Sequence, residues 1–63
     1  MKLKDLLHVV YYKNEIRFII LKKKDDDNNE EFYCKAYEKE VEQYYDYSVL
    51  LVDMEENLIV IYE

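Results

Sequence analysis

Two side chains of this sequence have the types that nucleophilic catalysis requires, namely His8 as a base and Cys34 as a nucleophile. They are the only histidine and the only cysteine, and no further residue is placed to orient the imidazole ring. Cys34 alternates with Phe32 and Ala36 on an expected core face, where a free cysteine usually behaves as a small hydrophobic residue. Ser48 is the only serine, and threonine and glycine are absent. We therefore expect no enzyme activity and no cofactor.

The acidic run from residue 25 to residue 31 offers the oxygen ligands that calcium prefers. It lacks the alternating ligand spacing and the central glycine of an EF-hand loop. Structural zinc needs roughly four nitrogen or sulfur ligands, which one histidine and one cysteine cannot supply. The polar run 22–31 instead favours a solvated hairpin loop, in which three lysines partly neutralise the acids. We expect no metal site, and a partner-binding acidic loop is the remaining alternative.

The distribution of charge is the strongest signal in the sequence. Residues 1–24 carry seven basic and two acidic groups (+5), and residues 25–63 carry two basic and thirteen acidic groups (−11), which together give the formal −6. Nucleic acids and anionic membranes repel such a protein. The opening apolar stretch is too short and too polar for a signal peptide or a membrane span. We therefore expect a cytoplasmic protein with no direct nucleic acid or membrane contact, whose partner presents a basic protein surface.

Eight tyrosines among 63 residues exceed what core packing requires. Tyrosine is enriched at protein interfaces because it combines a large contact area with a polar tip and few rotatable bonds. Beside carboxylates, exposed tyrosines form a surface on which carboxylates stand in for phosphates and aromatic rings stand in for bases. The candidate partner-binding residues are Tyr12, Asp25, Asp26, Asp27, Glu30, Glu31, Tyr33, Glu38, Glu42, Asp46 and Tyr47.

The elements that must position these residues follow from hydrophobic periodicity over a single domain, residues 1–63. Apolar residues recur at helical spacing in two segments, which begin at Leu3 and at Tyr37. Runs rich in β-branched and aromatic residues predict four strands, at residues 15–22, 32–37, 47–54 and 58–62. The order αββαββ suits an α+β fold: a four-stranded, mostly antiparallel sheet with both helices on one face.

Asparagine must supply the turns, because glycine and proline are both absent. Its short amide can bond locally, so it tolerates a left-handed backbone better than most residues. Asn14 is expected to end the first helix. Asn57 is expected to hold a positive φ at the end of the three-residue hairpin loop 55–57.

The predicted sheet is apolar on both faces, as the alternation of residues 16–21 and of the last hairpin indicates. Strands of that kind are buried on both faces, and the helices can cover only one. A domain of this size is also marginal without disulfides, metals or a partner chain. We therefore expect a homodimer, formed sheet against sheet or through a shared edge. The candidate interface residues are Ile19, Leu21, Val49, Leu51, Ile59 and Ile61.

The chain opens with Met1-Lys2-Leu3-Lys4-Asp5-Leu6-Leu7, which resembles the start of many very small proteins of phages and mobile elements in Gram-positive bacteria. As a whole the chain is tiny, acidic, tyrosine-rich and without a catalytic motif. In this it is similar in character to phage anti-defence proteins, namely anti-CRISPR and anti-restriction inhibitors. The resemblance implies an inhibitor in the host cytosol that blocks a defence protein, with nucleic-acid-binding proteins among the targets. A small structural or adaptor homodimer, whose acidic surface only keeps it soluble, is the alternative.

Overall fold

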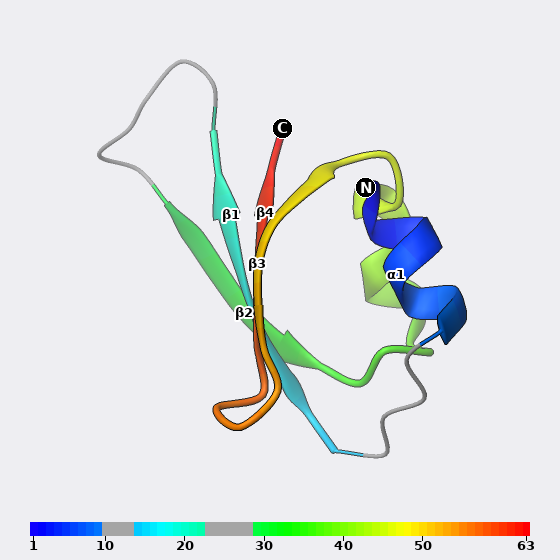
Figure 1. The fold of residues 1–63 in the computed structure, drawn as a ribbon, viewed down its shortest axis with the longest axis vertical. Helices are drawn as coiled ribbons and strands as arrows, with labels where there is room; N and C mark the ends of the chain where they lie inside the picture. Colours follow the sequence, from blue (N-terminus) through cyan, green and yellow to red (C-terminus); the bar gives the residue numbers. More distant parts are fainter. Residues whose placement is uncertain (10–13, 23–28) are drawn as a thin grey trace.

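The computed structural model describes residues 1–9, 14–22 and 29–63 (Figure 1). Four strands form one sheet in the order β2-β1-β4-β3, accompanied by a short α-helix and a 3-10 helix. This confirms the predicted small α+β fold. The elements are α1 (Leu3–Val9), β1 (Ile16–Leu21), β2 (Glu30–Cys34), η1 (Lys39–Tyr44), β3 (Ser48–Asp53) and β4 (Leu58–Tyr62).

The sheet is mostly antiparallel, as the sequence predicts, but its central pair is parallel, so the sheet is mixed. The hairpin pairs β1–β2 and β3–β4 are antiparallel, and the central pair β1–β4 is parallel. A parallel pair needs a long connection, which η1 and β3 provide as the chain passes from β2 to β4. As a result β2 and β3 are the two edges of the sheet.

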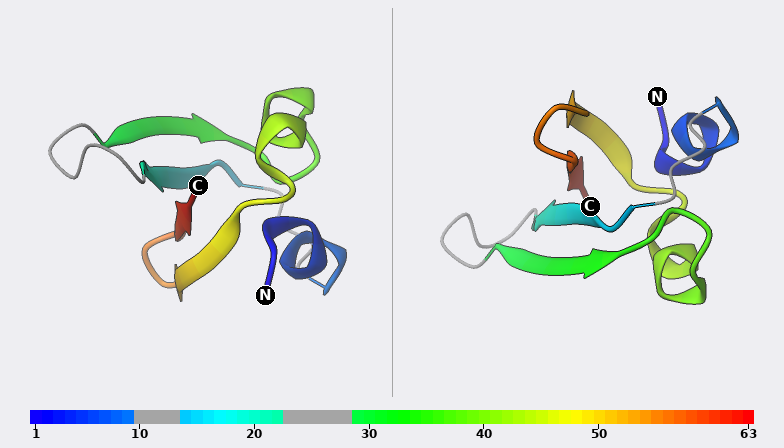
Figure 2. Two further views of the ribbon diagram at one scale, coloured as in Figure 1. Left: turned by 90° about the horizontal axis from the view of Figure 1, so that it is seen from above. Right: turned by 90° about the horizontal axis from the view of Figure 1, so that it is seen from below.

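The helices lie on the same side of the sheet, with α1 toward β3 and η1 toward β2 (Figure 2). Leu3 and Leu6, one helical turn apart, are buried beneath α1, as the apolar stripe predicts. The start of α1 is also tied to the segment before β3. The Leu3 N–H donates to the Tyr47 carbonyl at 2.8 Å, and the Lys4 N–H donates to the Tyr45 carbonyl at 3.0 Å.

The second helix differs from the expected amphipathic α-helix, because η1 is a six-residue 3-10 helix. Glu38 precedes it in extended conformation without a side-chain cap, so the first turn lacks the hydrogen bond that usually stabilises the start of an α-helix. Its hydrogen bonds span three residues, as from the Val41 N–H to the Glu38 carbonyl at 3.1 Å. Val41 is buried, but Tyr37 lies before the helix and is 64% exposed. The helical repeat predicted to begin at Tyr37 therefore does not include this residue.

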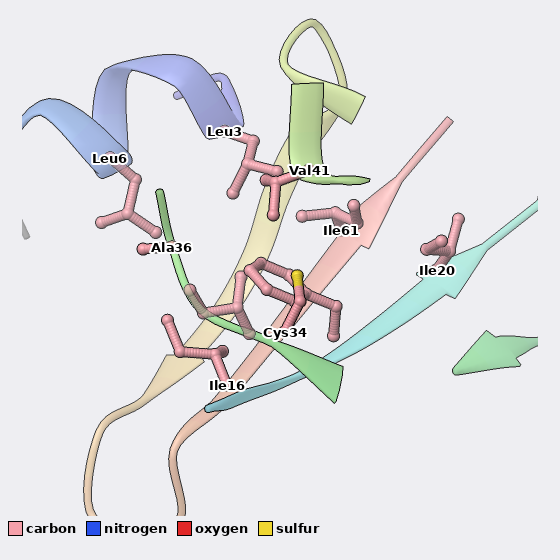
Figure 3. Packing of buried hydrophobic residues seen from close by; sticks show 10 residues of the cluster. Leu3, Leu6, Ile16, Ile20, Cys34, Ala36, Val41 and Ile61 are labelled. Atoms are coloured by element: carbon pink, nitrogen blue, oxygen red, sulfur yellow. The ribbon is translucent and has the colours of Figure 1, made fainter. Parts of the chain in front are cut away.

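The core lies between the helices and the inner face of the sheet (Figure 3). Phe18 at its centre is fully buried, and its ring stacks on Phe32 of the neighbouring strand. Cys34 and Ala36 join this core, as their alternation with Phe32 predicts. The buried residues are Leu3, Leu6, Ile16, Phe18, Ile20, Cys34, Ala36, Val41, Ile59 and Ile61.

The turn between β3 and β4 is formed as the sequence predicts. Asn57 has a φ of 52°, in the left-handed region that asparagine tolerates. The Asp53 carboxylate accepts hydrogen bonds from the backbone N–H groups of Glu55, at 3.2 Å, and Glu56, at 3.3 Å. These bonds fix the entry to the turn, so a tight hairpin forms without glycine.

Candidate protein-binding site

The β2 strand is an edge of the sheet, and the hydrogen bonds of β1 show which of its backbone groups are open. The Arg17 N–H donates to the Asn57 carbonyl at 2.7 Å, and the Leu21 carbonyl accepts from the Glu63 N–H at 3.1 Å. The backbones of Arg17 and Leu21 therefore face β4. Because backbone direction alternates along a strand, the backbone of Phe18 faces β2.

The same alternation applies within β2. Phe18 lies opposite Phe32, so these two residues form a hydrogen-bonded pair. The N–H and C=O groups of Glu31 and Tyr33 then point away from the sheet. Within residues 1–9, 14–22 and 29–63, no hydrogen bond outside the strand ladders uses these four groups. The open edge ends at Lys35, whose N–H donates to the carboxylate of Glu38.

A groove of about 560 Å³ lies along this edge, between β2 and η1. Five of its ten lining residues are glutamates, and none is lysine, arginine or histidine. The pairing of Ile16 with Cys34 brings Glu15 to the end of β2, where the chain turns toward Glu38 and Glu40. The lining residues are Glu15, Glu30, Glu31, Phe32, Tyr33, Cys34, Glu38, Glu40, Gln43 and Tyr44.

Aromatic rings connect this groove to the core. Phe32 stacks on Phe18 with ring centroids 4.9 Å apart, and on its other side it stacks on Tyr44 at 5.2 Å. Tyr47 meets Tyr44 edge-on, also at 5.2 Å. Burial, and secondarily the charge of Glu30, raises the pKa of the Tyr44 hydroxyl above its ordinary value. The groove thus offers half-buried aromatic surface and a neutral phenol alongside its carboxylates.

Two of the five groove carboxylates are paired with cations. The Arg17 guanidinium lies 2.9 Å from the Glu31 carboxylate, and Lys22 pairs with Glu30. The hydrogen bond from Arg17, followed by the one from the Tyr33 hydroxyl at 3.0 Å, lowers the pKa of Glu31. Five carboxylates less these two cations leave three negative charges.

The remaining carboxylates are Glu15, Glu38 and Glu40, for which no ion pair is formed within the part of the chain that the structure describes. Glu38 instead uses its carboxylate to hold the Lys35 N–H. Glu40 is exposed at the start of η1. The negative potential of the groove is therefore concentrated at the end where β2 meets η1.

The structure brings together some of the predicted partner-binding residues and separates others. Glu30, Glu31, Tyr33 and Glu38 all line the groove. Asp46 lies instead beside the start of α1, 3.3 Å from the Lys4 ammonium and 3.8 Å from that of Lys2. Glu42 is exposed on η1 but does not line the groove, and Tyr47 is half-buried against Tyr44. Tyr12, Asp25, Asp26 and Asp27 lie outside the described residues.

The sequence did not predict the other six groove residues, which are Glu15, Phe32, Cys34, Glu40, Gln43 and Tyr44. No local pattern marks them, because Glu15 meets Glu38 and Glu40 only through the pairing of β1 with β2. Only Tyr44 was indicated by the sequence, because its helical spacing from Val41 predicts that its side chain faces the sheet.

The Cys34 thiol borders the groove but is only 5% exposed. Burial, aided by the charges of Glu38, Glu40 and Glu15, raises its pKa to about 11. The thiol is therefore protonated at neutral pH, and the thiolate is the form that attacks electrophiles. His8, its imagined partner, is exposed on α1.

The outer face of the sheet, which the helices do not cover, divides into a polar and an apolar half. Arg17, Glu31 and Tyr33 interact on the β2 side. On the other side Leu51 lies opposite Val60, and Val60 pairs with Ile19, which forms an apolar row across three strands. Leu50, Leu51 and Val52 are 55%, 48% and 40% exposed.

The predicted dimer interface is corrected by this arrangement. A bulge between Val49 and Leu51 inserts one extra residue, so Leu51 shares the outer face with Val60. Ile19 and Leu21 also belong to that face, where they are half-buried. Val49 packs against the core, and Ile59 and Ile61 are fully buried within it. These three residues therefore do not face outward.

Comparisons with protein families, with curated proteins and with solved structures found nothing that matches this chain. In the described ranges, no three histidine, cysteine, aspartate or glutamate side chains gather as metal ligands. None of the helices described has the length and apolar character needed to cross a bilayer.

Proposed function

We propose that this chain is an acidic protein-binding module that engages a basic surface of another protein through the β2 groove. The observation that carries the proposal is the lining of that groove, with five glutamates and no basic residue around half-buried aromatic rings. Charge-assisted hydrogen bonds from lysine or arginine to such carboxylates are shorter and stronger than neutral ones. A row of carboxylates also speeds the approach of a positively charged partner.

More specifically, the chain is an inhibitor encoded by a phage or mobile element, and it blocks a host defence protein in the cytosol. The support is the likeness in size, acidity and tyrosine content to anti-defence proteins. A basic surface that normally receives nucleic acid meets carboxylates in place of phosphates and exposed rings in place of bases. Tyr33 and Tyr37, which are 59% and 64% exposed, supply such rings near the groove and η1.

The test is capture of a partner from host lysate with matched charge variants. The doubly substituted chain Glu38→Gln, Glu40→Gln removes two groove charges while keeping the shapes of the side chains. Glu55→Gln with Glu56→Gln makes the same change of charge in the exposed β3–β4 turn. We expect a basic protein to be captured by the unaltered chain and by the turn variant, and to be lost with the groove variant or at high salt.

The captured protein must then lose its own activity when the purified chain is added. For a nucleic-acid-binding target, gel-shift titration should show displacement by the unaltered chain and weak displacement by the groove variant. Capture that ignores both salt and the groove substitutions would refute recognition through this acidic surface.

The second candidate is a structural or adaptor homodimer formed through the outer face of the sheet. The apolar row from Leu51 through Val60 to Ile19 favours it, because exposed apolar patches commonly mark interfaces. In sedimentation experiments at micromolar concentration, the unaltered chain should be a dimer and Leu51→Lys a folded monomer. Tyr37→Lys, with the same change of charge at an exposed position, should remain a dimer. A folded monomer of the unaltered chain would exclude this assembly.

A further inference from the structure

We infer that the partner supplies an extended, basic segment that adds to the open edge of β2 as a fifth strand. The inference rests on the proposed function and names the form in which the partner is bound. Its basis is the backbone of β2, where Glu31 and Tyr33 turn their N–H and C=O groups away from β1. Addition of a strand to such an edge is a recurrent mode of peptide recognition, in which main-chain hydrogen bonds supply affinity.

The other edge of the sheet is closed to this mode. The Val49 N–H in β3 donates to the Met1 carbonyl at 2.8 Å, and Lys2 forms an isolated bridge with Ser48. Farther along β3, the bulge near Leu50 breaks the regular spacing that an added strand requires. Of the two edges, β2 is the one that presents regularly spaced, outward-pointing backbone N–H and C=O groups.

Charge decides which strand can occupy the β2 edge. A second copy of this chain, placed β2 against β2, would bring the two acidic grooves close together, each with three carboxylates that form no ion pair among the described residues. Like charges on paired strands are destabilising. A basic strand reverses the sign of that interaction, so we assign the edge to a different protein and not to self-association.

The groove also specifies which side of the added strand carries its cations. Glu31, on the outer face, is already paired with Arg17. Glu38 and Glu40, from η1 and the residue before it, line the groove on the helix side of the sheet and form no ion pair among the described residues. Successive side chains of a strand point to opposite faces. The bound segment should therefore alternate, with lysine or arginine toward the groove and β-branched residues toward the outer face.

The length of the segment follows from the limits of the edge. Glu31 and Tyr33 offer four backbone groups, and beyond them the Lys35 N–H is taken by the carboxylate of Glu38. Pairing thus covers one short stretch of β2. Lysine stems over Phe32 and Tyr44 would add apolar contact, since the long side chain buries its methylenes while its ammonium reaches a carboxylate.

The probe is a capped octapeptide of alternating valine and lysine, added to the full chain and followed by amide hydrogen exchange. At saturation the exchange rates of the Glu31 and Tyr33 amides should fall by a factor of about ten or more, because both amides become hydrogen-bonded. The Phe32 amide, already bonded to β1, serves as the internal reference. The matched control is the same peptide with methyl groups on alternate backbone nitrogens along its pairing edge, which keeps the charge but blocks strand pairing.

Protection of Glu31 and Tyr33 that the methylated peptide does not produce supports strand addition. Equal binding of the two peptides, without added protection, overturns the inference. The proposed function then still stands if the Glu38→Gln, Glu40→Gln variant binds both peptides more weakly. Failure of both peptides to bind also overturns the inference. The proposed function is then tested separately by whether capture of a partner from lysate depends on Glu38 and Glu40. In that outcome the acids of β2 only protect the edge from aggregation.

Discussion

The two edges of the sheet are managed in opposite ways. The β3 edge is covered by the chain itself, through the Val49 bond to Met1 and the bridge of Lys2 to Ser48, and then interrupted by a bulge. The β2 edge keeps a regular ladder and carries Glu30 and Glu31 beside a groove. Both arrangements discourage unwanted strand pairing. The covering of β3 by residues 1 and 2 also stabilises the fold, whereas the charge on β2 only selects which strands can pair with it.

The difference separates stability from recognition in a chain of 63 residues. Residues that seal the β3 edge are continuous with the core, since Leu3 is fully buried directly after the bridge at Lys2. Glu30 and Glu31, which border the open β2 edge, are exposed and form ion pairs only at the protein surface. Substitutions at the first edge should therefore affect folding, and those at the second should affect binding.

The largest expected effect is at the sealed edge. Leu3→Ala removes a fully buried side chain and should lower the free energy of unfolding by about 2–5 kcal/mol. Its matched control, Tyr33→Ala on the open edge, should stay within about 0.5 kcal/mol, because Tyr33 is mostly exposed. Urea denaturation of both variants measures the contrast. Equal losses at the two positions would show that the edges contribute alike to stability.

The second-largest expected effect on stability comes from the titration of Cys34, on the inner face of β2. Its folded pKa of about 11 lies above the ordinary 9.0, so the protonated thiol is favoured in the folded chain. The stability from this group is fully present below pH 9.0 and is lost as the pH rises through about 11. Near pH ~10.5 the loss is about 2 kcal/mol.

Comparison with Cys34→Ala isolates this contribution from that of other groups that titrate at high pH. The stability difference between the unaltered chain and the variant should shrink as the pH rises from 9.0 toward 11. Glu38→Gln should bring the thiol pKa partway back, because Glu38 is the largest charged contributor after burial. A difference that does not change with pH would contradict the shielding of the thiol at this side of the groove.

Local pattern predicted the parts of this fold that depend on neighbouring residues. The strand 58–62, the apolar stripe of α1 and the left-handed turn at Asn57 all follow from spacing or from side-chain chemistry. The parallel pairing of β1 with β4 could not be predicted in this way, since it depends on which strand of the second hairpin reaches β1. The sequence predicts an acidic surface, but the groove requires the pairing of β1 with β2 to bring Glu15 toward Glu40 of η1.

A single inserted residue also changed which side chains lie on the outer face. One extra residue at the bulge turned Leu51 outward, and no glycine marks that position. Strict alternation assigned Ile59 and Ile61 to the outer face together with Leu51, whereas both are core residues. Asp46 illustrates a further limit, because only the tertiary fold brings Lys2 and Lys4 to its carboxylate.

The turn next to the sealed edge gives a smaller, local effect. Asn57→Val should lower the free energy of unfolding by about 1–2 kcal/mol, because a β-branched residue resists the φ of 52°. Asn57→Gly should be neutral or slightly stabilising by the same reasoning. Amide exchange should rise along β3 and β4 before it rises in β2. Equal melting temperatures for the two variants would mean that backbone strain at this turn is negligible.

The smallest effect is at the open edge, in the network of Arg17, Glu31 and Tyr33. Arg17 is the main cause of the lowered pKa of Glu31, so Arg17→Gln should return that pKa toward 4.5. A carboxylate with a lowered folded pKa adds stability above its unfolded value, and this is lost as the pH falls through the folded pKa. The loss should be slight, because surface ion pairs contribute little.

Carboxyl-carbon NMR titration of Glu31 measures this shift directly, and Lys22→Gln, which removes the neighbouring Glu30 pair, is the matched control. The titration of Glu31 should move with Arg17→Gln and stay in place with Lys22→Gln. The variant also sharpens the difference between the edges. Without Arg17, the outer face of β2 gains an unpaired carboxylate, so a basic strand should tolerate lysine on both of its faces. If the alternating preference of the peptide is unchanged in Arg17→Gln, the pairing of Glu31 does not determine which side of the bound strand carries its cations.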